Sequence, residues 1–137
     1  MSSGEAELGL VNKVELKLIL AKDDKLGSLL GVYLCPLLLK LNSPHETVRK
    51  KVVEICQHID ERLRSRYVYG AINQPITNIY SSIELPIEAL INQFKDPTIT
   101  GNKYMMQTFD LMYIKKALKQ DKVSINYSIE HYNSFIV

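Results

Sequence analysis

The chain has 137 residues, of which 46% are hydrophobic and 23% charged, and its formal net charge at pH 7 is +2. This length allows one domain at most, or a piece of one, and the apolar content excludes a chain that is disordered throughout. The nearly neutral charge gives no general reason to expect nucleic acid or an acidic membrane as a partner.

The N-terminal segment is polar and rich in small residues, so we expect a flexible N-terminus over residues 1–9. It has neither the basic nor the apolar stretch that a secretory signal contains. The longest apolar stretch, residues 26–41, is broken by Gly31, Pro36 and Lys40 and is too short to span a bilayer. We therefore expect no membrane insertion and a cytoplasmic and nuclear location.

Residues 10–66 carry apolar side chains at spacings of three and four, which predicts a run of three helices. Asp23 and Asp24 offer a cap for the second helix. The predicted apolar stripes are Leu10, Val14, Leu18 and Ala21, with Val11 beside them; Leu26, Leu29, Leu30, Tyr33, Leu34, Leu37, Leu38 and Leu41; and Val48, Val52, Ile55, Ile59 and Leu63, with Cys56 beside them.

The boundary before the third helix is the clearest in the sequence. Ser43 can cap the helix, Pro44 suits its first position and Glu46 completes a capping box. On the polar face, Lys50 and Glu54 have the spacing of an ion pair. Two helices that meet at a proline-containing turn, with Val-Arg early in the second, are typical of a HEAT repeat.

The segment 67–82 has no charge and no helical period, and it contains the breakers Gly70 and Pro75. We expect an aperiodic loop or insertion with weak β-propensity. A further helical hairpin is predicted over residues 83–119, opened by Pro86 and interrupted at Asp96-Pro97. The tail, residues 120–137, is left unassigned.

A retained intron is an alternative origin for residues 67–82. Codons for Arg66, Tyr67 and Val68 can contain the splice donor GTATGT, and codons for residues 76–78 can contain the branch point TACTAAC. Codons for Tyr80-Ser81 can contain an acceptor TAG, so the three signals would stand in the correct order. This hypothesis predicts a segment that packs poorly, contributes no binding residue and can be removed without loss of helicity.

No pattern in the sequence predicts catalysis or a cofactor. A Cys-x-x-Cys pair, a glycine-rich phosphate loop and a nucleophile elbow are all missing. Cys56 and His58 are two apart on a helix and cannot share a metal ion. Cys35 and Cys56 are too few for a disulfide framework, and we expect both to be buried free thiols. We expect no catalytic, cofactor-binding or metal-binding residue.

Positive charge is concentrated along and after the third helix. A solvated helix face, with cations suited to the helix C-terminus, explains this charge most simply. Docking onto an acidic protein surface is the functional alternative, and nucleic acid is less favoured because no aromatic residues suitable for base stacking accompany the charges. The candidate docking residues are Arg49, Lys50, Lys51, Arg62, Arg64 and Arg66.

Five blocks of the sequence resemble the N-terminus of the proteasome-associated HEAT-repeat adaptor and scaffold family, most of all its fungal members. They are VELKLILA (14–21), YLCPLLLKLNSP (33–44), VRKKVVEICQHI (48–59), RSR (64–66) and IELPIEAL (83–90). The resemblance covers residues 11–66 and 83–114, so residues 67–82 interrupt a junction that the family has nearly continuous.

This resemblance implies an all-α fold of HEAT-like helical hairpins at the start of an α-solenoid, with the rest of the solenoid following the chain. It implies a non-catalytic scaffold whose partners are the proteasome core and regulatory particles, which the full-length family tethers in assembly and quality control. Two alternatives stay open: an independent helical protein-binding module of transport-adaptor type, and a nucleic-acid-associated protein that uses the arginine cluster.

Overall fold

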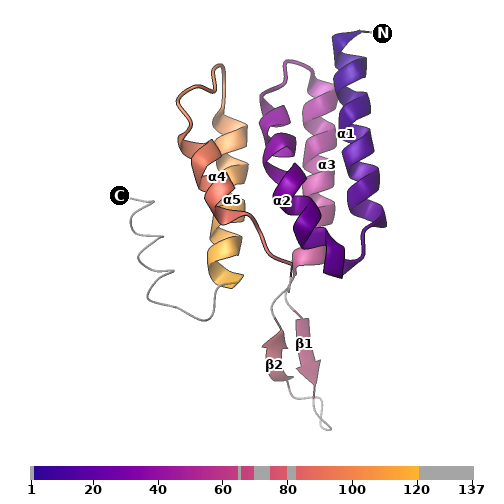
Figure 1. Cartoon of the computed structure of the whole chain (residues 1–137), viewed down its shortest axis with the longest axis vertical. Coiled ribbons are helices and arrows are strands. Elements are labelled where there is room, and N and C mark those ends of the chain that lie inside the picture. Colours follow the sequence, from indigo (N-terminus) through magenta and orange to yellow (C-terminus); the bar gives the residue numbers. More distant parts are fainter. Residues whose placement is uncertain (1, 65, 70–74, 80–82, 121–137) are drawn as a thin grey trace.

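The computed structural model of the chain describes residues 2–64, 66–69, 75–79 and 83–120, so the tail from residue 121 onward lies outside the described residues. Figure 1 shows two helical groups side by side and a β-hairpin below them. The elements in chain order are α1 (Ser3–Leu20), α2 (Asp23–Leu39), a short 3-10 turn η1 (Lys40–Asn42), α3 (Glu46–Leu63), β1 (Arg66–Tyr69), β2 (Pro75–Ile79), α4 (Ile87–Lys95) and α5 (Tyr104–Gln120).

The helices form one stack with a continuous apolar core. α1 packs mainly on α3, and α4 and α5 form an antiparallel hairpin whose α5 packs on α2 and η1. Within the described residues, the buried apolar side chains of α1 to α5 belong to a single cluster, which includes Leu18, Leu34, Ile55, Leu90 and Ile114. The predicted all-α class of HEAT-like hairpins, as at the start of a solenoid, is confirmed.

The helix α1 begins at Ser3, so the expectation of a flexible segment over residues 1–9 is wrong for its helical part. The Ser2 side chain accepts a hydrogen bond from the Glu5 N–H at 3.1 Å, which satisfies a donor that the first turn leaves unpaired. The Ser3 hydroxyl also contacts His45 Nε2 at 3.1 Å, which fastens this end to the loop before α3. The cap and this contact stabilise the first turns of α1, over residues that were expected to be flexible.

The predicted inner stripe of α1 is correct except at Leu10. Val11 and Leu18 are buried and Val14 is half-buried, whereas Leu10 is 58% exposed. Successive residues of a helix are rotated by about 100°, so Leu10 and Val11 cannot both point into the same narrow contact with α3. Val11 occupies this position, and Leu10 points to solvent.

The whole predicted stripe of α3 is buried. Its members are at most 9% exposed: Val48, Val52, Ile55, Cys56, Ile59 and Leu63. The predicted capping box before this helix is wrong in register, because His45 is the N-cap residue and makes no side-chain cap. The Ser43 hydroxyl instead accepts the N–H of His45 at 3.1 Å, inside the turn.

Residues 67–82 are not wholly a loop, which corrects the prediction. β1 and β2 pair antiparallel, with Arg66 opposite Ile79 and an irregularity between Val68 and Tyr69. The runs Tyr67-Val68-Tyr69 and Ile76-Thr77 are β-branched and aromatic, and such residues favour a pleated strand once a partner strand satisfies their backbone. In Figure 1 the hairpin projects away from the helices, and among the described residues β1 and β2 contact only each other.

Candidate interaction surfaces

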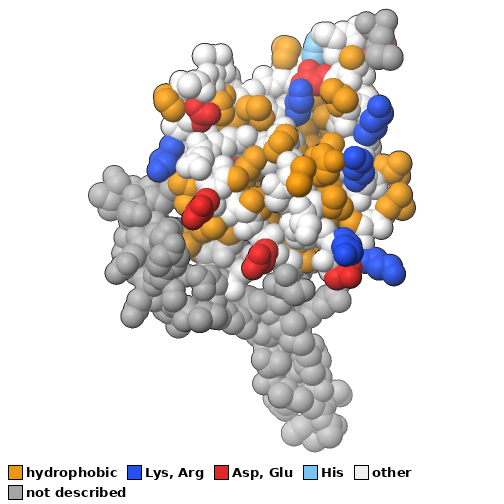
Figure 2. All heavy atoms as spheres, viewed as in Figure 1, with side chains coloured by type: hydrophobic (Ala, Val, Ile, Leu, Met, Phe, Trp, Pro, Cys, Tyr) orange, Lys and Arg blue, Asp and Glu red, His pale blue; other side chains and the backbone are white. Residues whose placement is uncertain are grey.

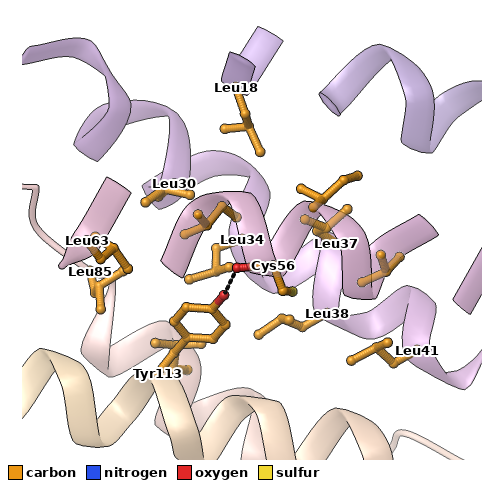
Figure 3. Close-up of a cluster of buried hydrophobic side chains, with 14 of the residues drawn as sticks. Leu18, Leu30, Leu34, Leu37, Leu38, Leu41, Cys56, Leu63, Leu85 and Tyr113 are labelled. Carbon is orange, nitrogen blue, oxygen red and sulfur yellow. Dashed lines mark hydrogen bonds between the residues drawn. The ribbon is translucent and has the colours of Figure 1, made fainter. Parts of the chain in front are cut away.

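The junction between the two helical groups is closed by side chains that donate to backbone oxygens. The Tyr113 hydroxyl of α5 donates to the Cys56 carbonyl of α3 at 3.3 Å, and Figure 3 shows the ring reaching from α5 into the leucine cluster. On the same junction, Gln93 Nε2 donates to the Cys35 carbonyl at 2.8 Å. These two bonds give the side-chain donors partners on the other helical group, and they link α5 to α3 and α4 to α2.

Both cysteines are free, as predicted, although Cys35 is only half-buried whereas Cys56 is fully buried. Burial raises the pKa of the Cys35 thiol to about 11 and that of Cys56 to about 12. A thiol is nucleophilic as the thiolate, which is scarce at neutral pH when the pKa is this high. Both cysteines therefore act as apolar packing groups.

Asp110 is the most unusual side chain of the junction. It lies on α5, is 0% exposed, and neither carboxylate oxygen has a hydrogen-bond partner among the described residues. Burial raises the pKa of this carboxyl to about 7, because desolvation penalises the charged form. After burial, the charge of Asp110 is the second cause that raises the pKa of the Cys35 thiol.

The first three candidate docking residues lie in the N-terminal half of α3 and have intramolecular partners. Arg49 donates to the Ser43 carbonyl at 2.7 Å and so fixes the turn before its own helix. Lys51 pairs with Glu15 of α1 at 2.9 Å, and this bond raises the pKa of Lys51. Lys50 pairs with Glu46 at 3.2 Å, so the predicted pair with Glu54 is wrong; Glu54 contacts Lys51 instead.

Arg62 fastens the C-terminal end of α1. Its guanidinium donates to the carbonyls of Leu18 and Ala21 at 2.9 and 2.7 Å, and to Asp23 at 2.6 Å. The last carbonyls of a helix have no partner within it, and a planar guanidinium can serve several at once. Asp23, in the first turn of α2, is therefore a partner of Arg62. The prediction that an aspartate caps α2 is wrong, because Lys22 is the N-cap residue.

The candidate residues whose side chains are described do not form one continuous patch. Arg49 and Arg62 are at opposite ends of α3, which separates them by about 20 Å at 1.5 Å per residue. Arg64 is exposed just after the helix, and the side chain of Arg66 lies outside the described residues. Docking through these residues stays a prediction, for which Lys50 and Arg64 are the exposed members.

The outer face of α1 is apolar, which the sequence-based prediction missed. Leu16 is 58% exposed, Ile19 48% and Leu20 73%. Their i, i+3, i+4 spacing places them on the side away from Val11 and Leu18. The signal was present in the sequence, since residues 14–21 carry more apolar side chains than a single helix face needs.

The described residues contain no group of three or more His, Cys, Asp or Glu side chains that could hold a metal ion. None of the helices in this part of the chain has the length and apolar character needed to cross a bilayer.

Comparison with known proteins identifies the family. The profile described as proteasome component ECM29, N-terminal, matches residues 11–124. The chain belongs to the ECM29 family. Its relatives in this family carry names that refer to the proteasome and, in one case, to a scaffold.

Three relatives illustrate the similarity to ECM29 proteins. The Schizosaccharomyces pombe proteasome component ecm29 is 37% identical over 91% of this chain and 6% of its own length. The Drosophila melanogaster proteasome-associated protein ECM29 homolog is 40% identical over 65% of this chain and 4% of its own length. The human proteasome adapter and scaffold protein ECM29 is 33% identical over 83% of this chain and 5% of its own length.

The chain thus spans only a small part of the ECM29 proteins that it matches, at most 6% in these three. No solved structure matches the chain significantly.

Proposed function

We propose that this chain is a non-catalytic unit of a proteasome scaffold and that it binds the proteasome. The observation that carries the proposal is the family match over residues 11–124, with relatives named as proteasome components or as a proteasome adapter and scaffold. The stacked hairpins support it, because an array of this kind offers extended surfaces for other proteins.

The side chains that could have supplied chemistry have structural roles. The thiol of Cys56 is buried, and the Tyr113 hydroxyl is used to bond a carbonyl of α3. Arg49, Lys51 and Arg62 hold turns and neighbouring helices. These roles favour a scaffold over an enzyme.

We extend the proposal to the partners of the full-length protein. It would tether the core particle of the proteasome to the regulatory particle, in assembly and quality control, and would act in the cytoplasm and nucleus. HEAT-like repeats would continue the stack beyond α5, since each added hairpin covers the apolar face of the one before it. Imaging of the fluorescently tagged chain tests the location.

Binding tests the core of the proposal. The purified chain is mixed with intact proteasome, with core particle alone and with regulatory particle alone, and each mixture is sedimented. We expect co-sedimentation with the proteasome, and weaker binding after reversing the exposed charges in a Lys50→Glu, Arg64→Glu variant. Lys115→Glu, Lys119→Glu on α5 is the matched control, since both lysines are exposed. A chain that sediments with none of the three would contradict the proposal and favour an independent adaptor module.

A further inference from the structure

The outer face of α1 carries an exposed apolar stripe that consists of Leu16, Ile19 and Leu20. Their inner neighbours Val11 and Leu18 already fill the contact with α3, so the stripe is not needed for the core. In Figure 2 hydrophobic side chains protrude at the right-hand edge of the molecule, over α1, with Lys or Arg side chains beside them. The solvent-facing side of a surface helix is usually polar, and the outer face of α1 departs from this pattern.

The charge around the stripe is positive. Lys13 and Lys17 lie three residues before Leu16 and Leu20, so they line one side of the stripe, and Lys22 follows the end of α1; all three lysines are exposed. Lys17 also donates to the Tyr33 hydroxyl at 3.0 Å and lies over its ring, which holds its ammonium group at the surface between α1 and α2.

Three of the nearby carboxylates pair with other groups. Glu7 pairs with Lys40 and Glu15 with Lys51, which turns the acidic side of α1 toward η1 and α3. Asp23 accepts from Arg62 at 2.6 Å. Between residues 8 and 25, Asp24 is then the one exposed carboxylate for which the described residues show no such pair. The same range carries four exposed lysines, so its surface charge is positive: Lys13, Lys17, Lys22 and Lys25.

We propose that the outer face of α1 is a docking site for an acidic amphipathic helix of a partner protein. Apolar residues of the partner at i, i+3 and i+4 would pack on Leu16, Ile19 and Leu20, and its flanking carboxylates would meet Lys13, Lys17 and Lys22. Complementary charge favours this occupant and would orient it along α1.

Two other occupants fit the surface less well. A second copy of the chain would bring the lysines of both α1 helices together, which disfavours self-association. A membrane surface is disfavoured because α1 has no aromatic residue to anchor it at the interface, and because its opposite side is held by α3. A partner helix, by contrast, can bind with one apolar stripe of the chain and the lysines on one side of that stripe.

Peptide binding to the full chain tests the proposal. The probe is a fluorescein-labelled helical peptide of about 18 residues, or five turns, with leucines at the spacing given above and glutamates on both flanks. The comparison peptide has lysine in place of every glutamate. We expect fluorescence anisotropy to show binding of the acidic peptide and a dissociation constant at least about tenfold higher for the lysine peptide.

Variants assign the binding to the stripe. Leu16→Glu, Leu20→Glu should weaken binding at least about tenfold. Leu10→Gln should leave it unchanged, because Leu10 has the same 58% exposure as Leu16 but points about 120° away around the helix, and glutamine adds no charge beside Lys13. The double variant Lys13→Glu, Lys22→Glu should bind the lysine peptide more tightly than the acidic one. It leaves the Lys17–Tyr33 contact in place. Circular dichroism confirms that each variant is folded.

Three results would overturn the proposal. The first is equal affinity for the acidic and the lysine peptide, or binding that the stripe variants do not change. The second is a dimer of the chain that Leu16→Glu dissociates, which would assign the face to a second copy. The third is sedimentation with phosphatidylserine vesicles that depends on Leu16, without binding of the acidic peptide.

Discussion

At the scale of single residues, Asp110 makes the stability of the fold depend on pH. Its carboxyl is buried without a hydrogen-bond partner among the described residues, and its pKa is raised from the usual 3.8 to about 7. Between these two values the folded state binds a proton that the unfolded state has released. The free energy of unfolding therefore falls as the pH rises from 4 to 7, by up to about 1.4 kcal/mol per pH unit.

The variant Asp110→Asn removes this titration. We expect it to be more stable than the parent at pH 8, by at least about 1 kcal/mol, because the parent must then bury a charge. The advantage should become small toward pH 4, where the carboxyl of the folded parent is neutral and that of the unfolded chain is close to its own pKa of 3.8. Urea unfolding followed by circular dichroism between pH 4 and 8 measures this, with the exposed Asp24→Asn as the control. If the free energies of unfolding of Asp110→Asn and the parent change with pH in the same way, the carboxyl of Asp110 is solvated in the folded state.

A second residue-scale prediction concerns Arg62. Arg62→Lys keeps the charge but cannot reach both carbonyls of α1 and Asp23 at once, so we expect a loss of about 2 kcal/mol in the free energy of unfolding. Arg64→Lys, at an exposed position, should change it by less than about 0.5 kcal/mol. Chemical denaturation of the two variants measures the difference. Equal stability would mean that the end of α1 does not depend on the guanidinium.

At the scale of elements, α3 is the central helix, and its stripe decides whether the fold forms. Val52 and Ile55 are 0% and 1% exposed. An aspartate at either position would be an unpaired buried charge, so Val52→Asp and Ile55→Asp should each abolish the cooperative thermal transition or the solubility of the chain. Lys50→Ala is the control, because a surface pair such as Lys50–Glu46 contributes less than about 1 kcal/mol. If both aspartate variants melt like the parent, the stripe is not the core.

The hairpin β1–β2 gives a prediction of its own. Its strands contact only each other among the described residues, and the pairing of Arg66 with Ile79 brings its two ends together. Residues 67–78 can therefore be replaced by Asn-Gly, the dipeptide that best closes a two-residue hairpin turn. We expect the helical circular dichroism signal and the melting temperature to be retained. A large loss of either would show that the hairpin supports the helices.

The intron hypothesis for residues 67–82 is tested separately by sequencing the mature transcript. A retained intron predicts a spliced form that lacks this segment. If every mature message encodes residues 67–82, the segment belongs to the protein and the hypothesis is wrong. The observed hairpin does not decide between the two, since any segment rich in β-branched and aromatic residues can pair with itself.

At the scale of the whole molecule, the sequence predicts the helices and buried faces that follow from the periodicity of apolar residues. It does not predict the side-chain positions that depend on contacts between distant elements. The α3 stripe could be predicted residue by residue, because its apolar residues follow the 3.6-residue helical period on one face, and only that face can be buried. The burial of Asp110 could not be predicted, because nothing in the local sequence indicates that α5 turns this polar residue into the core. Likewise the partners of Arg62 are about 40 residues earlier in the chain, beyond any local rule.

The last prediction follows from the size of the chain relative to its family. A solenoid extends in proportion to its number of repeats, and a scaffold can join two bodies only by spanning them. The chain corresponds to 4–6% of the length of the three relatives described above. A stack this short covers only a small part of the full-length array, so we expect it to contact one particle without reaching a second.

We therefore expect the chain alone to bind without tethering. In cells that lack the full-length family member, its expression should leave the ratio of regulatory to core particle in affinity-purified proteasomes unchanged. Expression of a full-length relative should raise that ratio and serves as the positive control. The chain itself should still be found in the purified material, because binding and bridging are separate properties of a solenoid. Restoration of the ratio by the chain alone would show that one end of the array is sufficient, and that length is not what joins the two particles.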